Sequence, residues 1–284
     1  METRARAATQ RGEEAFHFLL RGCAGPQPSQ ALAEAVGRDS SRRRIGSGSG
    51  GSFLSDLSEP LSVALWRVTE KHFAAKDEHA GMQLLALWAA QPGRVWTTKK
   101  PLKTLKDWEG MKFAGGAAIN VDIAKALGGV GIRAAGPQAS EMVRRGVADG
   151  LFIDASSFTD FSLAGTIKHV LDFPKGIYSA TFFLGMNKAK WNALSAEDRA
   201  AIQKISGEPL SRAAGRNWDA EAAKSRENVK AAGVEVTMAS GAYLKELDDK
   251  LHFLEDDWLK GAQGAGVDGR AALNELRSIV NNYK

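Results

Sequence analysis

The stretch that decides the fold is WAAQPGRVWTTKKPLKTLKDWEGMKFAGGAAINVDIAKALGG, residues 88–129. Its first part is apolar and extended, and a second extended piece, RVWTTKK, begins at Arg94. A short helical turn, TLKDWEG, closes at Gly110, and a strand, MKFAG, follows. The pair Gly115-Gly116 then leads into a helix that ends in further glycines. This order of strand, glycine pair and helix is typical of an α/β layer.

The alternation continues on both sides of that stretch. Upstream, SEPLSVALWRVTEKHFAAKDEHA has the apolar stripe of a helix, and MQLLALWAA is a buried strand. Downstream, VGIRAA, LFIDA, KHVLDF and GIYSATFFLGMN are predicted strands, and PQASEMVRRGVADG is a predicted helix. Residues 190–281 are mainly helical, with one short strand, VEVTMA. From residue 52 onward, the pattern therefore predicts an α/β protein with parallel strand pairing.

The first 51 residues differ from the rest in composition. They hold eight arginines, no lysine and five acidic residues, and they include the Gly/Ser run GSGSGGS. No strand precedes that run and no Gly-Lys-Ser/Thr follows it, so a linker is a better interpretation than a phosphate-binding loop. We expect residues 1–51 to be a disordered leader.

Charge and cysteine content exclude several classes. The net charge is +5, but most of the excess lies in the first 51 residues, so the body lacks the basic balance of a nucleic-acid-binding protein. The single cysteine, Cys23, excludes an internal disulfide framework. The sequence has no run of 18 apolar residues and no convincing signal-peptide core.

Motifs for cofactors, metals and catalysis are missing. GVGIRA, residues 129–134, fits a dinucleotide-binding spacing, but its glycines end a helix instead of beginning one. The five histidines show no metal-ligand spacing, and no histidine pairs with Cys23 or a serine as a nucleophile. Asp149 and Asp154 could form a carboxylate pair, although Asp149 before Gly150 also suits a turn. We expect no cofactor, no metal and no enzyme activity.

The glycine pair is the sequence's best candidate for a binding site. A strand ending at Gly115-Gly116 would leave the free N–H groups of the next helix facing a ligand, and such groups attract anions such as carboxylates. The alternative is that two small residues only allow a tight turn. The sequence leaves both open.

The motifs as a set resemble a known family. RVWTTKKPLKTLKDWEGMKF, then GVADGLF, then YSATFFLGMNKAKWNALSAEDRAAI, are similar to the DctP-like solute-binding proteins of tripartite ATP-independent periplasmic (TRAP) transporters. The resemblance covers residues 53–284. It implies a type II periplasmic-binding fold, in which two α/β lobes are joined by crossing strands and a long base helix. It also implies a periplasmic receptor that binds a small organic acid between the lobes and delivers it to a membrane permease.

The resemblance also implies site residues. Arg94 matches an arginine that lines the cleft in the family, and the Gly115-Gly116 helix start is expected beside it. Asp154 lies in a segment that supplies cleft residues. Tyr178, at the start of a crossing strand, faces either the cleft or the core. The family's carboxylate-binding arginine corresponds to Ala114, so that salt bridge is absent.

The front of the chain departs from the family, whose first lobe begins with several βα units. We therefore expect an incomplete first lobe with exposed strand edges around residues 84–90 and 181–186. The predicted boundaries are a leader at 1–51, a first lobe with base helix at 52–92 and 179–234, and a second lobe at 93–178 and 235–284. The predicted function is a TRAP solute receptor. An α/β enzyme that uses Asp149 or Asp154 as a base, or a truncated remnant that does not bind, are the alternatives.

Overall fold

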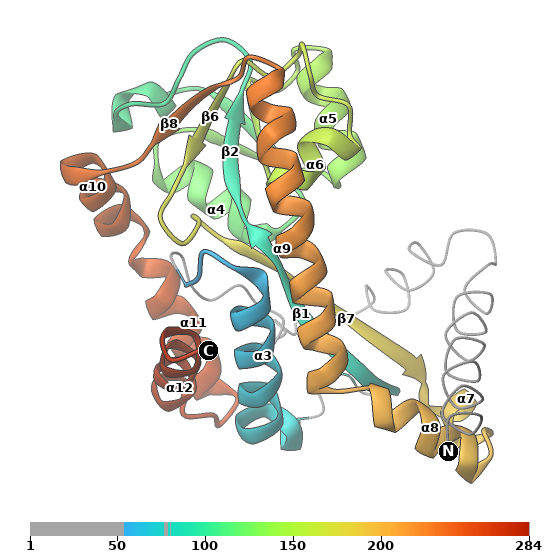
Figure 1. Ribbon diagram of the computed structural model, residues 1–284. Helices are drawn as coiled ribbons and strands as arrows, with labels where there is room; N and C mark the ends of the chain where they lie inside the picture. The colour runs from blue at the N-terminus through green and yellow to red at the C-terminus, as the bar shows by residue number, and fades with distance from the viewer. Residues whose placement is uncertain (1–53, 77–78, 80, 284) are drawn as a thin grey trace.

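The computed structural model describes residues 54–76, 79 and 81–283, which form two groups of elements joined by long strands and one long helix (Figure 1). The helices are α3 (Ser58–Val68), α4 (Ala118–Ala126), α5 (Gly136–Arg144), α6 (Ala155–Asp160), α7 (Lys188–Asn192), α8 (Ala196–Ile205), α9 (Glu208–Ala231), α10 (Gly241–Leu251), α11 (Phe253–Gly264) and α12 (Gly269–Asn281). The strands are β1 (Met82–Pro92), β2 (Arg94–Thr97), β3 (Lys112–Gly115), β4 (Val130–Arg133), β5 (Gly150–Ile153), β6 (His169–Asp172), β7 (Ser179–Asn187) and β8 (Glu235–Met238). Three short helical turns complete the described part of the chain: a π-helical turn η1 (Thr69–Phe73) and the 3-10 turns η2 (Ala74–Lys76) and η3 (Leu105–Trp108).

The second lobe is built on a six-stranded sheet in the order β4-β3-β5-β2-β6-β8. β3 is parallel to β4 and β5, and β6 is parallel to β8, as the alternation of strands and helices predicted. β2 is antiparallel to both of its neighbours. It differs because only Gly93 separates it from β1, so it enters the sheet directly from the first lobe.

Side chains alternate between two cores, one on each face of this sheet. On the face covered by α4 and α10, called the α4 face, Val95 packs with Phe113 and Phe152. On the face covered by α5, α6 and α9, called the α6 face, Trp96 packs with Leu151. Burial on both faces explains why these strands read as nearly continuous apolar runs in the sequence.

The two lobes are linked by an antiparallel ribbon of β1 and β7. Hydroxyl groups from two helices cover the outer edge of β1, because Leu87 N–H donates to Ser211 Oγ over 3.1 Å and Ala89 N–H donates to Ser62 Oγ over 3.0 Å. Most of β1 is buried, whereas β7 is mostly half-buried and Phe182 is 42% exposed. The expected exposure is therefore present on β7, but α3 and α9 cover β1.

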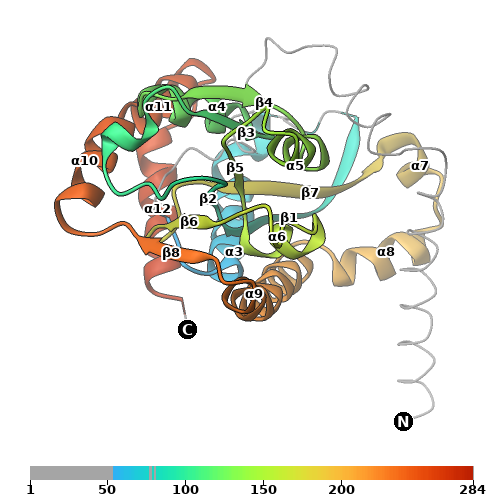
Figure 2. The same cartoon turned by 90° about the horizontal axis from the view of Figure 1, so that it is seen from above.

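The base helix is α9, whose 24 residues contact α3 and β1 in the first lobe and α6 in the second. Figure 2 looks nearly along its axis and shows α3 and α6 beside it. Among the described residues, β1 and β7 are the strands of the first lobe, in keeping with the expected incomplete lobe. The predicted leader, residues 1–51, lies outside the described part of the chain.

The C-terminal helices differ from the predicted boundaries. β8 and α10 join the second lobe, but α12 packs against α3 in the first lobe and α11 packs against α12 (Figure 1). The apolar side of α12 explains this position, since Ala272 and Leu276 share a core with Leu61 of α3. Residues 253–281 therefore contact the lobe opposite to the predicted one.

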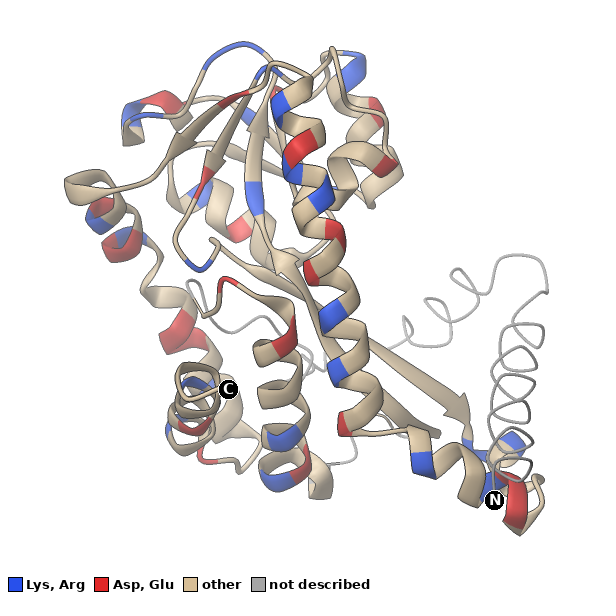
Figure 3. Cartoon of the chain, in the orientation of Figure 1, with Lys and Arg blue, Asp and Glu red and all other residues tan. Residues whose placement is uncertain are grey.

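Charged residues of both signs are spread over both lobes, and both signs occur along α9 (Figure 3). Of the helices in the described part of the chain, none combines the length and apolar character that crossing a bilayer demands.

Candidate ligand-binding site

The predicted site residues gather where the strands of the six-stranded sheet begin or end beside the β1–β7 ribbon. β2 begins there with Arg94, β3 ends there with Gly115, and β5 ends just before Asp154. Gly116 follows β3, and Tyr178 immediately precedes β7. We call this place the hinge edge. It corresponds to the strand ends at which open α/β sheets bind their ligands.

Arg94 is buried at the hinge edge, with 9% of the residue exposed. Its Nε lies 2.9 Å from Oδ1 of Asp172, at the end of the neighbouring strand β6. Its Nη1 is buried and has no partner among the described residues. By strand alternation with Trp96, the Arg94 side chain belongs to the α6 face. The arginine therefore faces inward and keeps a donor that is not used.

Asp154 is the N-cap of α6, so much of its hydrogen-bonding capacity is used locally. Its Oδ1 accepts from Ser157 N over 3.0 Å and from Ser156 Oγ over 2.6 Å, and its Oδ2 accepts from Ser157 Oγ over 2.9 Å. Aspartate caps a helix in this way because it satisfies N–H groups that lack an acceptor within the helix. α6 was not predicted from the sequence, although the stretch Asp-Ala-Ser-Ser at its start begins with a recognisable N-cap residue.

The carboxylate pair that Asp149 and Asp154 could have formed is absent from the structure. Asp149 precedes β5 and Asp154 follows it, so about five residues of extended chain, roughly 16 Å, separate them. Asp149 Oδ2 accepts from Lys112 N over 3.0 Å, and its main-chain carbonyl accepts from Thr98 N. Both contacts tie Asp149 to segments next to β5 in the sheet.

Tyr178 belongs to the core of the α4 face and also borders the hinge edge. Its ring occupies the space beside Gly93, where a Cβ atom would lie 2.1 Å from Tyr178 Cε1. Its ring also meets Phe152 edge to face, with centroids 6.0 Å apart. Burial, and after it the negative charge of Asp154, raises the pKa of the Tyr178 hydroxyl far above its usual value. The hydroxyl therefore stays protonated, as a neutral group.

The glycine pair serves two purposes. A Cβ on Gly115 would lie 2.6 Å from the Cβ of Asn120, so glycine is needed there for packing. Gly116 is exposed and has no neighbour closer than 3.8 Å to the position of a Cβ. Asn120 is 2% exposed, and its Oδ1 accepts from Ala117 N over 3.0 Å. Asn120 was not among the predicted site residues, because a polar residue in the first turn of a helix carries no distinctive signal.

Ala114, at the position of the family's arginine, is fully buried on the α6 face. It packs in the same core as Trp96 and Ala139, and strand alternation puts it on the same face as Arg94. The second arginine that the resemblance implies is thus replaced by a small core residue on the side of the sheet to which Arg94 belongs.

Gln91 connects the hinge edge to two helices, and sequence analysis missed it. Its Nε2 donates to the carbonyl of Trp218 on α9 over 2.7 Å, and its Oε1 accepts from Ser156 N on α6 over 3.3 Å. Close by, the ring of Phe182 stacks on both Trp88 and Trp218, with centroids 6.1 and 5.8 Å apart. The β1–β7 ribbon and α9 therefore carry stacked aromatic rings on the side where Gln91 contacts α9.

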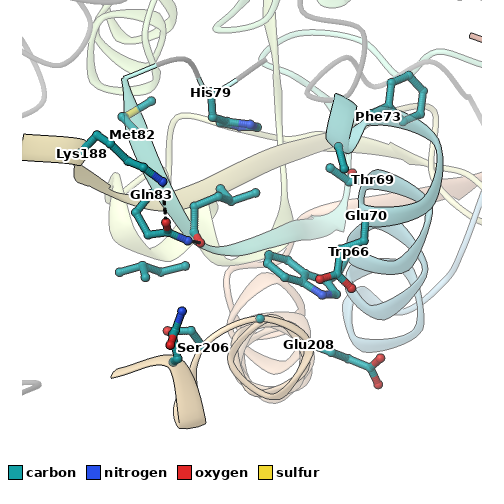
Figure 4. A pocket seen from close by; sticks show the side chains of 15 residues that line it. Trp66, Thr69, Glu70, Phe73, His79, Met82, Gln83, Lys188, Ser206 and Glu208 are labelled. Atoms are coloured by element: carbon teal, nitrogen blue, oxygen red, sulfur yellow. Dashed lines mark hydrogen bonds between the residues drawn. The ribbon is translucent and has the colours of Figure 1, made fainter. Parts of the chain in front are cut away.

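A cavity of about 620 Å³ lies at the other end of β1, between α3, β1 and the start of α9 (Figure 4). Trp66 and Glu70 form one wall, and Gln83 and Lys188 form the opposite one. Lys188 Nζ donates to Gln83 Oε1 over 2.9 Å, so these polar groups satisfy each other. None of the predicted site residues lines this cavity.

The described residues contain no cluster of three or more potential metal ligands. Two of the histidines face carboxylates instead: His72 Nε2 lies 2.8 Å from Glu275 Oε2, and His169 Nδ1 lies 3.1 Å from Glu235 Oε2.

Comparison with known proteins identifies relatives. The profile of the bacterial extracellular solute-binding proteins of family 7, DctP, matches residues 63–258. A TRAP periplasmic solute-binding protein of Bordetella bronchiseptica, with bound (R)- and (S)-mandelate, is 32% identical, with a TM-score of 0.82 over 87% of this chain and 78% of that one. Another from Rhodoferax ferrireducens, in complex with benzoate, is 25% identical, with a TM-score of 0.77 over 86% and 76%. The outer membrane transporter protein TsaT of Comamonas testosteroni is 31% identical over 230 residues, which are 80% of this chain and 67% of that protein.

Proposed function

Because this chain belongs to the DctP family of bacterial extracellular solute-binding proteins, we propose that it captures a small aromatic carboxylic acid at its hinge edge. Its role is that of the solute receptor of a TRAP transporter. We further propose that it works in the periplasm, that it delivers its ligand to the membrane permease of that transporter, and that it does not transform the ligand.

The buried Nη1 of Arg94, which has no acceptor among the described residues, is the observation on which this proposal rests. A guanidinium group binds a carboxylate through charge-assisted hydrogen bonds, and such bonds are strongest where water is excluded. Asp172 uses Nε and holds the group in place, while Nη1 remains a buried donor without an acceptor. A buried donor of this kind costs about 1–3 kcal/mol, and a ligand carboxylate would remove that cost.

The other predicted residues have supporting roles in the proposal. Gly115 and Gly116 allow the chain to turn so that the first N–H groups of α4 face the ligand. Tyr178 offers a neutral hydroxyl and a ring face. Asp154 contributes mainly by fixing the start of α6, since its oxygens already accept three hydrogen bonds.

Two features favour an aromatic acid over other organic acids. The mandelate-bound and benzoate-bound relatives hold aromatic carboxylates. In this chain, Trp88, Phe182 and Trp218 place stacked rings beside the hinge, and aromatic rings favour flat apolar partners.

A thermal-shift screen tests the proposal. The chain would be heated with benzoate, mandelate, an aliphatic acid such as succinate, and the neutral compound benzamide. We expect benzoate and mandelate to raise the melting temperature, because a ligand that binds the folded state stabilises it. Equal effects of benzoate and benzamide would contradict carboxylate recognition, and consumption of the acid would indicate an enzyme. Absence of any shift would mean a remnant that does not bind.

A further inference from the structure

A second buried donor at the hinge edge lacks an acceptor. Asn120 is 2% exposed, and its Nδ2 has no hydrogen-bond partner among the described residues. The orientation of this amide is fixed, because its other atom, Oδ1, accepts the N–H of Ala117 over 3.0 Å. Reversing the amide would break that bond, so the free atom is the donor nitrogen.

The position of this donor is also fixed. The Asn120 side chain presses on the end of β3, since a Cβ on Gly115 would come within 2.9 Å of its Cβ, Oδ1 and Cγ atoms. Asn120 is the third residue of α4, a helix of nine residues. The first two N–H groups of that helix, on Ala118 and Ile119, have no acceptor within the helix. Three donors therefore share the start of α4.

This donor group is separate from Arg94. Gly115 of β3 and Arg94 of β2 both pair with β5, which lies between them. Two strand spacings, about 10 Å, therefore separate β2, which carries Arg94, from β3, which leads into the helix that carries Asn120. Asn120 and Arg94 also lie on opposite faces of the sheet, the α4 face and the α6 face. One carboxylate is too small to reach both, whereas a ligand lying along the hinge edge, across the end of β5, can meet one donor at each end.

We propose that Asn120 Nδ2, with the first N–H groups of α4, binds a second oxygen acceptor of the ligand, across the ring from the carboxylate that Arg94 takes. This subsite rests on the proposed function and defines its substrate class further. The ligand is an aromatic acid that carries a second oxygen, such as a carbonyl or hydroxyl, on the far side of its ring. Because the donors are neutral, the subsite selects for acceptor capacity and does not require a second negative charge.

The variant Asn120→Asp isolates this role. Its carboxylate keeps an acceptor for Ala117 N–H, and the helix start favours a negative charge, which offsets part of the cost of burying it, so the variant should still fold, as its melting temperature would show. The donor Nδ2, however, is replaced by a carboxylate oxygen, which accepts hydrogen bonds. Asn187→Asp is the matched control, because Asn187 also caps a helix, accepting from Ala189 N over 3.0 Å, but lies at the far end of β7.

Three ligands of the same shape read out the subsite by calorimetry. para-Ethylbenzoate has no oxygen outside its carboxylate. para-Acetylbenzoate has one further oxygen, which only accepts hydrogen bonds, and para-(1-hydroxyethyl)benzoate has one that both accepts and donates. The unaltered chain should bind both oxygenated acids about fivefold tighter than the ethyl compound. In Asn120→Asp, the acetyl compound should lose that advantage while the hydroxyethyl compound keeps it. Asn187→Asp should match the unaltered chain.

Different results overturn different claims. If the ratios of the three affinities are the same in Asn120→Asp as in the unaltered chain, the subsite is wrong although the receptor function stands. A similar affinity of the unaltered chain for all three acids has the same meaning. Binding of none of these three acids by the unaltered chain would overturn the subsite, and a failure to bind unsubstituted benzoate as well would overturn the proposed function with it.

Discussion

Arg94 donates from Nε to Oδ1 of Asp172 over 2.9 Å. Arg94 is the first residue of β2, where the chain enters the six-stranded sheet from the other lobe, and Asp172 is the last residue of the neighbouring strand β6. The same carboxylate oxygen accepts the N–H of Phe173 over 2.9 Å, so Asp172 is itself held in place. An arginine oriented in this way keeps part of its planar group for a ligand. The pair therefore serves as a support for binding and also ties β2 to β6.

Replacing Gly93 by alanine should destabilise the hinge. The added Cβ would lie 2.1 Å from the ring of Tyr178, which is rigid and buried, so ring or backbone must move. Overpacking of this kind should lower the free energy of unfolding by about 3 kcal/mol. Urea unfolding measures it. Gly261→Ala in α11 is the control, since its Cβ would have no neighbour within 4 Å, and it should stabilise by up to about 1 kcal/mol. Equal effects of the two substitutions would refute the packing argument.

Asp154 should matter to stability through its side-chain oxygens and not through its charge. Asp154→Asn keeps an acceptor for Ser157 N and should change the free energy of unfolding little, whereas Asp154→Ala removes the cap and should cost about 1 kcal/mol. Removing the negative charge should also leave benzoate affinity equal or higher. A loss of benzoate binding in Asp154→Asn would mean that the carboxylate contacts the ligand directly.

Acid should weaken the contact between α3 and α9 through Glu59. A hydrogen bond from Arg216, and after it one from the Tyr283 hydroxyl, lowers the pKa of Glu59 below 4.5. A carboxyl group whose pKa is lower in the folded state stabilises the fold above its unfolded pKa, and this stabilisation disappears as the pH falls through the folded value. Glu59→Gln should therefore flatten the loss of stability below pH about 4.5, as followed by urea unfolding at several pH values. The control is Glu227→Gln, at an exposed position, which should leave the stability of the unaltered chain at each pH in place. If Glu59→Gln lost stability below that pH as steeply as the unaltered chain, the contact of Glu59 with Arg216 would not cause the sensitivity to acid.

Local patterns predicted most of the second lobe. The strand at residues 112–115, the glycine turn and the helix after it are encoded by neighbouring residues, and the structure has them in that order. The buried run of β1 and the long helix α9 were also readable, because their periodicity extends over many residues.

Tertiary contacts decided what the sequence could not. α12 packs on α3 because their apolar sides match in space, and nothing near residues 269–281 in the sequence names that partner. The need for glycine at position 115 depends on Asn120, and the inward direction of Arg94 depends on Asp172, far away in the chain. Of the site, the sequence and the resemblance together named residues that the fold brings to one end of the sheet, and their role in binding stays a prediction. Their division between two faces required the register of β2, β3 and β5.

The central claim, that Arg94 binds a ligand carboxylate at the hinge edge, is tested most directly by calorimetry with benzoate. Arg94→Gln combined with Asp172→Asn removes both charges but keeps hydrogen-bonding side chains, so the fold does not retain a buried unpaired charge. Arg145→Ala, an exposed arginine after α5, is the control. We predict that the double variant stays folded and binds benzoate at least about tenfold more weakly, while Arg145→Ala binds normally. Unchanged benzoate affinity in a folded double variant would contradict the account.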